Sequence, residues 1–150
     1  MKSWLWVLLG FVLCFAMFWV SVFWVYGVET RHSNRTGIWW PERGRNLIPP
    51  DATDIRLQRD VLDHYACYSI DEKDLVAFLS QRFATGDGGF DVDFARGTVD
   101  EKIIGGRIGR LNFLITETTV LYACHASNGG MHRFYHDPAT DKTFQSSAYW

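Results

Sequence analysis

The chain has 150 residues, with 15 Lys and Arg against 17 Asp and Glu, which gives a formal net charge of −2 at pH 7. A net charge near zero without any basic block argues against a nucleic-acid-binding surface, so no nucleic acid is expected as a partner. The sequence contains no internal repeat and no low-complexity tract, so a repeat architecture is not expected.

The chain begins with a long apolar segment. From Trp4 to Val28 no side chain carries a charge. As a helix, this stretch would reach roughly 37 Å, against about 30 Å of hydrocarbon in a bilayer. Aromatic rings at both ends, Trp4 and Trp6 and then Trp24, suit the headgroup level. We therefore predict a transmembrane anchor over residues 1–28, a single-pass membrane protein and the lipid bilayer as its partner.

Two other interpretations of this segment are open. A cleaved signal peptide would have an apolar region of only about 7 to 15 residues, although the site at residues 25–27 is acceptable for cleavage. A buried helix that is apolar on every face would need a larger protein around it.

The residues next to the apolar segment give conflicting evidence on which side of the membrane the domain would lie. Counting Lys2 against Arg31 and Arg35 would place the carboxyl side in the cytoplasm. A short basic tail directly before the span is instead typical of a signal anchor that exports the domain attached to it. We expect the domain to lie outside the cytoplasm, where another membrane or envelope protein would be its partner.

Polar residues dominate the stretch 29–46, around the single apolar patch 38–41. This composition predicts a linker that does not fold alone. The stretch 47–150 that comes next, roughly a hundred residues, is sufficient for one globular domain with a modest core.

Hydrophobic periodicity predicts the elements of this domain in chain order. A first strand over 55–59 and a second over 64–70 precede a helix that is capped by Asp71 and continues to Phe83. The glycine-rich stretch 84–109 is expected to be a loop that contains a short strand or turn.

Four more strands, joined by short turns, are expected over 110–116, 119–126, 131–137 and 142–149. The order of elements predicts an α+β fold, in which a small antiparallel sheet, a meander, is packed by one helix and preceded by the transmembrane helix.

Three stretches carry a resemblance to known proteins. These are "IPPDATDI" (48–55), "YSIDEKDLVAFL" (68–79) and "LYACHASNGGMHRFYHDPATDKTF" (121–144). Together they resemble an uncharacterised family of small bacterial, often membrane-anchored proteins, which share an IPPxATxI opening and a GGxHxxYxD hairpin. The resemblance implies a bacterial origin and a fold, and it implies no activity.

Cys67 in "HYAC" and Cys124 in "LYAC" occupy equivalent strand positions. If the two strands are neighbours, the sulfur atoms could form a disulfide, which would require export from the reducing cytosol. The alternative is that both are small buried apolar residues.

Several residues have the chemistry of zinc ligands: His64, Cys67, Cys124, His125, His132 and His136. Their spacing argues against a site, because residues 132 and 136 lie roughly 13 Å apart along a strand at about 3.3 Å per residue. No CxxC or HExxH motif is present. We therefore predict no metal and no cofactor.

Catalytic patterns are equally weak. Ser127 near His125 has no nucleophile-elbow motif, and Asp63 with Asp137 is only a hypothetical carboxylate pair. The loops "GGRIGR" (105–110) and "DGGFDVD" (87–93) lack the register of phosphate-binding or calcium-binding loops. No catalytic residue is therefore predicted.

The turn "SNGGMHRF" (127–134) predicts a hairpin, beside which His132, Tyr135 and His136 would line a surface groove. Two classes of function are consistent with these patterns. We favour a membrane-anchored binding or accessory module, and the alternative is a small membrane-tethered hydrolase or metal-dependent enzyme that uses the histidines and acids of the hairpin.

Overall fold

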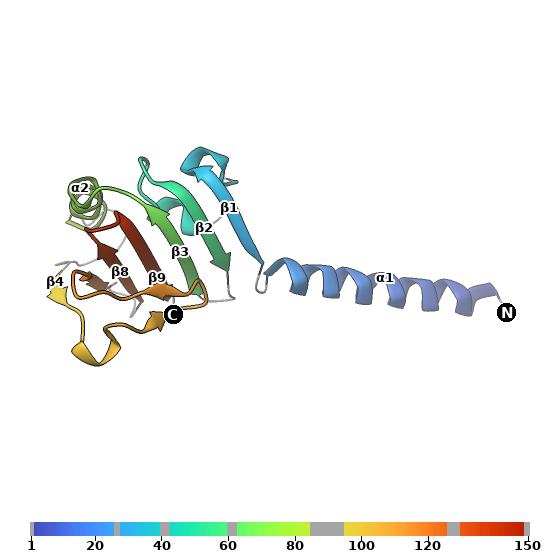
Figure 1. Cartoon of the computed structure of the whole chain (residues 1–150). Coiled ribbons are helices and arrows are strands. Elements are labelled where there is room, and N and C mark those ends of the chain that lie inside the picture. The colour runs from blue at the N-terminus through green and yellow to red at the C-terminus, as the bar shows by residue number, and fades with distance from the viewer. Residues whose placement is uncertain are drawn as a thin grey trace.

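A computed structural model of the chain describes residues 2–25, 28–39, 43–59, 63–84, 95–125 and 130–148 (Figure 1). Its helices are α1 (Lys2–Val25), η1 (Arg35–Gly37), η2 (Arg43–Leu47), α2 (Glu72–Ala84) and η3 (Glu101–Ile103), where η denotes a 3-10 helix. Its strands are β1 (Glu29–Asn34), β2 (Thr53–Arg59), β3 (Asp63–Ser69), β4 (Ala95–Thr98), β5 (Arg107–Ile108), β6 (Phe113–Leu114), β7 (Val120–His125), β8 (Met131–Asp137) and β9 (Lys142–Ala148).

Seven of these strands form one antiparallel sheet in the order β1-β2-β3-β9-β8-β7-β4. Two meanders, β1 to β3 and β7 to β9, meet where β3 pairs with β9 along its whole length, from Asp63↔Ala148 to Ser69↔Lys142. A separate small ladder joins β5 to β6. Strands that are far apart in the sequence therefore form the middle of the sheet.

Each face of the sheet has its own core, because successive side chains of a strand alternate between faces. On one face, Leu75, Leu79 and Phe83 of α2 pack against sheet residues that include Tyr122 and Phe134. On the other face, the segment 99–115 covers a second core. Figure 1 shows α2 and this yellow and orange segment on opposite sides of the sheet.

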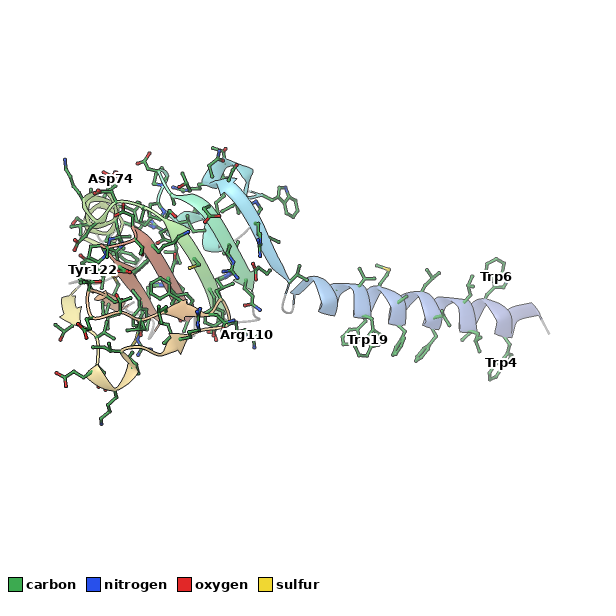
Figure 2. The ribbon with its side chains drawn as sticks, viewed as in Figure 1. Trp4, Trp6, Trp19, Asp74, Arg110 and Tyr122 are labelled. Carbon is green, nitrogen blue, oxygen red and sulfur yellow. The ribbon has the colours of Figure 1, made fainter. Side chains whose placement is uncertain are left out.

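α2 begins where the sequence indicates. The Asp71 carboxylate accepts a hydrogen bond from the Lys73 amide at 2.8 Å, and its carbonyl accepts one from the Leu75 amide at 3.0 Å. The Tyr122 hydroxyl of β7 donates to Glu72 Oε1 at 2.6 Å and ties the first turn of α2 to the sheet. Figure 2 shows Asp74 and Tyr122 at this end of the molecule.

The prediction of a transmembrane helix is contradicted. Within the described residues, none of the helices combines the length and the apolarity that crossing a bilayer requires. The anchor over 1–28, the signal anchor, the single-pass topology and the membrane localisation are corrected accordingly.

α1 extends away from the sheet, and Figure 2 shows Trp4, Trp6 and Trp19 projecting from it without touching the domain. The side chains of Trp4 and Trp6 are 78% and 72% exposed. The described part of α1 therefore contributes nothing to either core.

The predicted fold class also needs correction. The chain forms a large antiparallel sheet with two α-helices in its described part, in place of a small meander packed by one helix after a membrane span. The stretch 29–46, expected to be a linker, supplies the edge strand β1, and Ile38 beside it is buried in the core under α2. Polar side chains are compatible with an edge strand because its pairing uses the backbone.

The strands expected over 55–59, 64–70, 119–126, 131–137 and 142–149 are confirmed as β2, β3, β7, β8 and β9 to within two residues at their ends. The strand expected over 110–116 is reduced to β6. Gly109 and Asn112 adopt positive φ angles of 64° and 55°, which turn the chain just before it.

Candidate functional site

A cavity of about 330 Å³ lies between the β5–β6 segment and the ends of β2, β3 and β9. We call it the hairpin cavity. Its charged lining is Asp54, Arg56, Asp137 and Lys142, its apolar lining includes Leu111, Phe113 and Leu114, and Cys67 and Tyr68 complete the strand side. The size is at the lower end of the range typical of small-ligand pockets.

A β-bulge shapes the charged rim of this cavity. The register between β2 and β3 shifts between Thr53 and Arg56, and Asp54 within the shift has a φ of +49°. Bulges redirect side chains, and here Asp54 Oδ2 lies 2.8 Å from Lys142 Nζ of β9. This hydrogen bond with Lys142 is the main cause that lowers the pKa of Asp54.

Arg56 makes the second ion pair at the rim. Its Nε lies 2.8 Å from Glu29 Oε1 and its Nη2 lies 3.1 Å from Glu29 Oε2, a two-point contact between β2 and β1. The hydrogen bond raises the pKa of Arg56 and lowers the pKa of Glu29. Exposed pairs such as these contribute about 0–1 kcal/mol to stability, so exchanging one for a ligand costs little.

Asp137 has a structural role at the base of the cavity. Burial alone would raise the pKa of Asp137, but hydrogen bonds from Thr118 Oγ1 (2.6 Å), Thr140 Oγ1 (3.0 Å) and the Ala139 amide (3.2 Å) hold it below its usual value. The hypothetical partner Asp63 begins β3 and lies at the opposite end of the sheet. The two carboxylates therefore do not form a pair.

Cys67 faces the hairpin cavity from β3, directly across from Arg56 of β2. Burial raises the pKa of the Cys67 thiol, and the positive charges of Arg56 and Lys142 offset this only in part. The thiol is therefore protonated at neutral pH, which does not suit a nucleophile.

The structure does not bring Cys67 and Cys124 together. Both thiols are free. β9 and β8 separate β3 from β7, so the strands lie roughly 14 Å apart at about 4.8 Å per strand. The register also puts the side chains on opposite faces, with Cys67 in the core under the β5–β6 segment and Cys124 in the core under α2. The expectation of a possible disulfide between Cys67 and Cys124 is therefore contradicted by the structure.

The predicted surface site at the hairpin is also corrected. His132 and His136 are fully buried on the sheet face under α2, whereas Tyr135 points to the other face and packs against Phe144 at 6.1 Å between ring centroids. Alternation along β8 explains this separation. These three residues therefore do not line a common groove.

Each histidine has a core environment. The His132 ring lies 5.6 Å from the Phe83 ring of α2, and His136 Nδ1 lies 2.9 Å from Thr143 Oγ1. Burial is the main cause that lowers the pKa of His132 to about 4, and the charges of Arg82 and His64 act in the same direction. Burial also lowers the pKa of His136.

The remaining candidates give no site. Across the described ranges, no group of three or more His, Cys, Asp or Glu side chains could hold a metal ion. Ser127, the side chain of His125 and the loop 87–93 lie outside the described residues. The stretch 105–110 contains β5 and the start of the turn to β6, across which Arg107 Nη1 donates to the Asn112 carbonyl at 2.9 Å.

Sequence reasoning missed the residues at the rim of the hairpin cavity. Asp54 and Lys142 lie within the stretches 48–55 and 121–144, but no pattern of binding-site residues joins them to Arg56, and only the bulge and the pairing of β3 with β9 bring the three together. The one available signal was the cluster of charged residues after "IPPDATDI". These residues do not alternate with apolar ones, so the sequence does not indicate which face of the sheet they occupy.

No protein-family model, curated protein or solved structure matches the chain. The resemblance carried by residues 48–55, 68–79 and 121–144 therefore stays a prediction.

Proposed function

We propose that the domain is a binding module whose ligand site is the hairpin cavity. The observation that carries the proposal is the exposed pair of Lys142 and Asp54, two opposite charges 2.8 Å apart at the rim of a cavity with an apolar lining. The side chains of this pair are 44% and 69% exposed, so a ligand reaches both charges from solvent.

The charges favour a zwitterionic ligand of amino-acid type. Its carboxylate would replace Asp54 on Lys142, and its ammonium group would replace Lys142 on Asp54, so both charges of the protein keep a partner. Hydrogen bonds to charged groups contribute about 1.5–3 kcal/mol each. An apolar side chain of the ligand would then lie against Leu111 and Phe113, which are nearly buried.

The lining favours binding over catalysis. The Cys67 thiol is held protonated by burial, and the Asp137 oxygens already accept hydrogen bonds from threonines. A general base or nucleophile needs a poised pKa and a free position beside the substrate. No specific observation favours the alternative of a hydrolase or metal-dependent enzyme.

Isothermal titration with L-leucine tests the proposal. We expect saturable binding to the full chain, and none with N-acetyl-L-leucine amide, which lacks both charges. Lys142→Gln should weaken binding tenfold or more, since one lost charge-assisted hydrogen bond corresponds to about that factor. The control Lys102→Gln alters an exposed lysine outside the cavity and should bind normally.

Two results would contradict the proposal. One is the absence of saturable binding of L-leucine, and the other is an equal affinity of the Lys142→Gln and Lys102→Gln variants.

A further inference from the structure

Two ion pairs lie at the rim of the hairpin cavity. One is the pair of Lys142 and Asp54, which the proposed function assigns to the ligand. The other is the pair of Arg56 and Glu29, in which both carboxylate oxygens accept a hydrogen bond, at 2.8 Å and 3.1 Å. Arg56 lines the cavity together with Asp54, and Glu29 reaches Arg56 from the edge strand β1.

Glu29 holds the guanidinium group of Arg56 on the outer side of β2. In the register of the sheet, Arg31 of β1 lies opposite Arg56 on one side, and Cys67 of β3 lies opposite it on the other. Because Cys67 faces the cavity, a contact with a residue of β1 draws the guanidinium group away from it. The side chains of Arg56 and Glu29 are 34% and 32% exposed, so this pair can open without disturbing either core.

Asp54 is the acidic residue of the cavity lining that lies closest to Arg56 along the chain. The two are separated by one position in β2, and the bulge in this strand carries Asp54 at a φ of +49°. The hydrogen bond with Lys142 is the main cause that lowers the pKa of Asp54, and the positive charge of Arg56 acts in the same direction. A guanidinium group released by Glu29 therefore has Asp54 as its next acceptor.

This arrangement decides which charges a ligand has to carry. While Arg56 is paired with Glu29, a ligand whose carboxylate takes Lys142 has to supply a cation to Asp54 in exchange. A ligand without an ammonium group would leave the Asp54 carboxylate without its hydrogen bond, which is unfavourable. If Arg56 turned to Asp54 instead, the carboxylate would keep a partner and the ammonium group of the ligand would no longer be needed.

We propose that Glu29 makes the hairpin cavity select for the amino group of its ligand. By holding Arg56 on the side of β1, Glu29 keeps Asp54 available to the ammonium group. This inference rests on the proposed function, and it adds a residue that sets the specificity of the site. Glu29 acts through Arg56 and touches no ligand, so it is a positioning residue.

Isothermal titration of the full chain with two ligands of the same carbon skeleton tests the inference. L-Leucine carries a carboxylate and an ammonium group, and 4-methylpentanoate lacks only the amino group. The unaltered chain should bind L-leucine about tenfold more tightly. In Glu29→Gln, 4-methylpentanoate should bind more tightly and L-leucine more weakly. The ratio of the two dissociation constants should change by about fivefold, the upper end for an exposed ion pair.

Two controls separate the position of Arg56 from a change in net charge. Glu101→Gln removes the same charge from an exposed residue of η3 and should leave the ratio as it is in the unaltered chain. Arg56→Gln has no guanidinium group to release, so adding Glu29→Gln to this variant should not change the ratio further. If the amide spectrum shows that Glu29→Gln does not fold, Glu29→Asp replaces it, because its shorter side chain cannot make both contacts with Arg56.

The outcomes distinguish this inference from the proposed function. If L-leucine does not bind to the unaltered chain, the proposed function is contradicted and this inference with it. If L-leucine binds but the ratio is the same in Glu29→Gln and Glu101→Gln, the inference alone is overturned. It is also overturned if Glu29→Gln changes the ratio equally in the presence and in the absence of Arg56.

Discussion

At the scale of single residues, the buried imidazole of His132 makes the stability of the domain depend on pH. The ordinary pKa of 6.5, which applies in the unfolded chain, falls to about 4 in the folded protein because burial disfavours the charged ring. Between these values the unfolded chain binds more protons, so folding becomes less favourable as the pH falls. We expect this group to remove about 2 kcal/mol of stability between pH 7.5 and pH 5.

Urea unfolding at pH 7.5 and at pH 5 measures this loss. His132→Gln cannot titrate and should show a smaller difference between the two pH values. Some dependence should persist because burial also lowers the pKa of His136. Equal differences for the variant and the unaltered chain would show that His132 is not the cause.

Gly109 offers a second prediction at this scale. It has a φ of +64°, and a Cβ at this position would overlap the ring of Phe144 in the core under the β5–β6 segment. Gly109→Ala should therefore lower the free energy of unfolding by about 2–3 kcal/mol, from strain and overpacking together.

Gly105→Ala is the matched control. Gly105 has a φ of +80° and no atom within 4 Å of its added Cβ, so only backbone strain of about 1 kcal/mol is expected. Chemical denaturation of both variants separates strain from packing. If the two lose equal stability, Phe144 does not close against the turn as described.

At the scale of elements, α2 depends on its first turn. Asp71→Ala removes the acceptor for the Lys73 amide and should lower the free energy of unfolding by about 1 kcal/mol. Asp71→Asn keeps an acceptor and should lose only a few tenths, from the weaker interaction with the helix dipole. Denaturant unfolding compares the two variants, and equal losses would mean that charge, not the cap, matters.

The same elements show how far sequence reasoning reaches. β3 was predictable because aromatic and small apolar residues alternate over 64–70, and β8 and β9 because turn residues at 127–130 and 137–141 bound them. α2 was predictable because a capping residue precedes its apolar period. β1 was missed because an edge strand needs no apolar side chain, and its register with β2 is a property of the backbone. β6 was overestimated because the left-handed conformation of Asn112 has no periodic signature.

At the scale of the whole molecule, the order of strands was beyond prediction. A meander pairs neighbours in the sequence, whereas here the pairing of β3 with β9 joins two meanders into one sheet. That single pairing separates Cys67 from Cys124 and aligns His64 with His132. The hairpin cavity depends on this pairing, and for this reason it was not visible as a motif.

The pairing of β3 with β9 also imposes an order on biosynthesis. β1, β2 and β3 leave the ribosome early, but the free edge of β3 is covered only after β9 has been synthesised. Contacts so distant along the chain close slowly, and an uncovered strand edge is a template for association with other chains. A nascent chain of this protein therefore has to be kept from its neighbours until translation has passed β9.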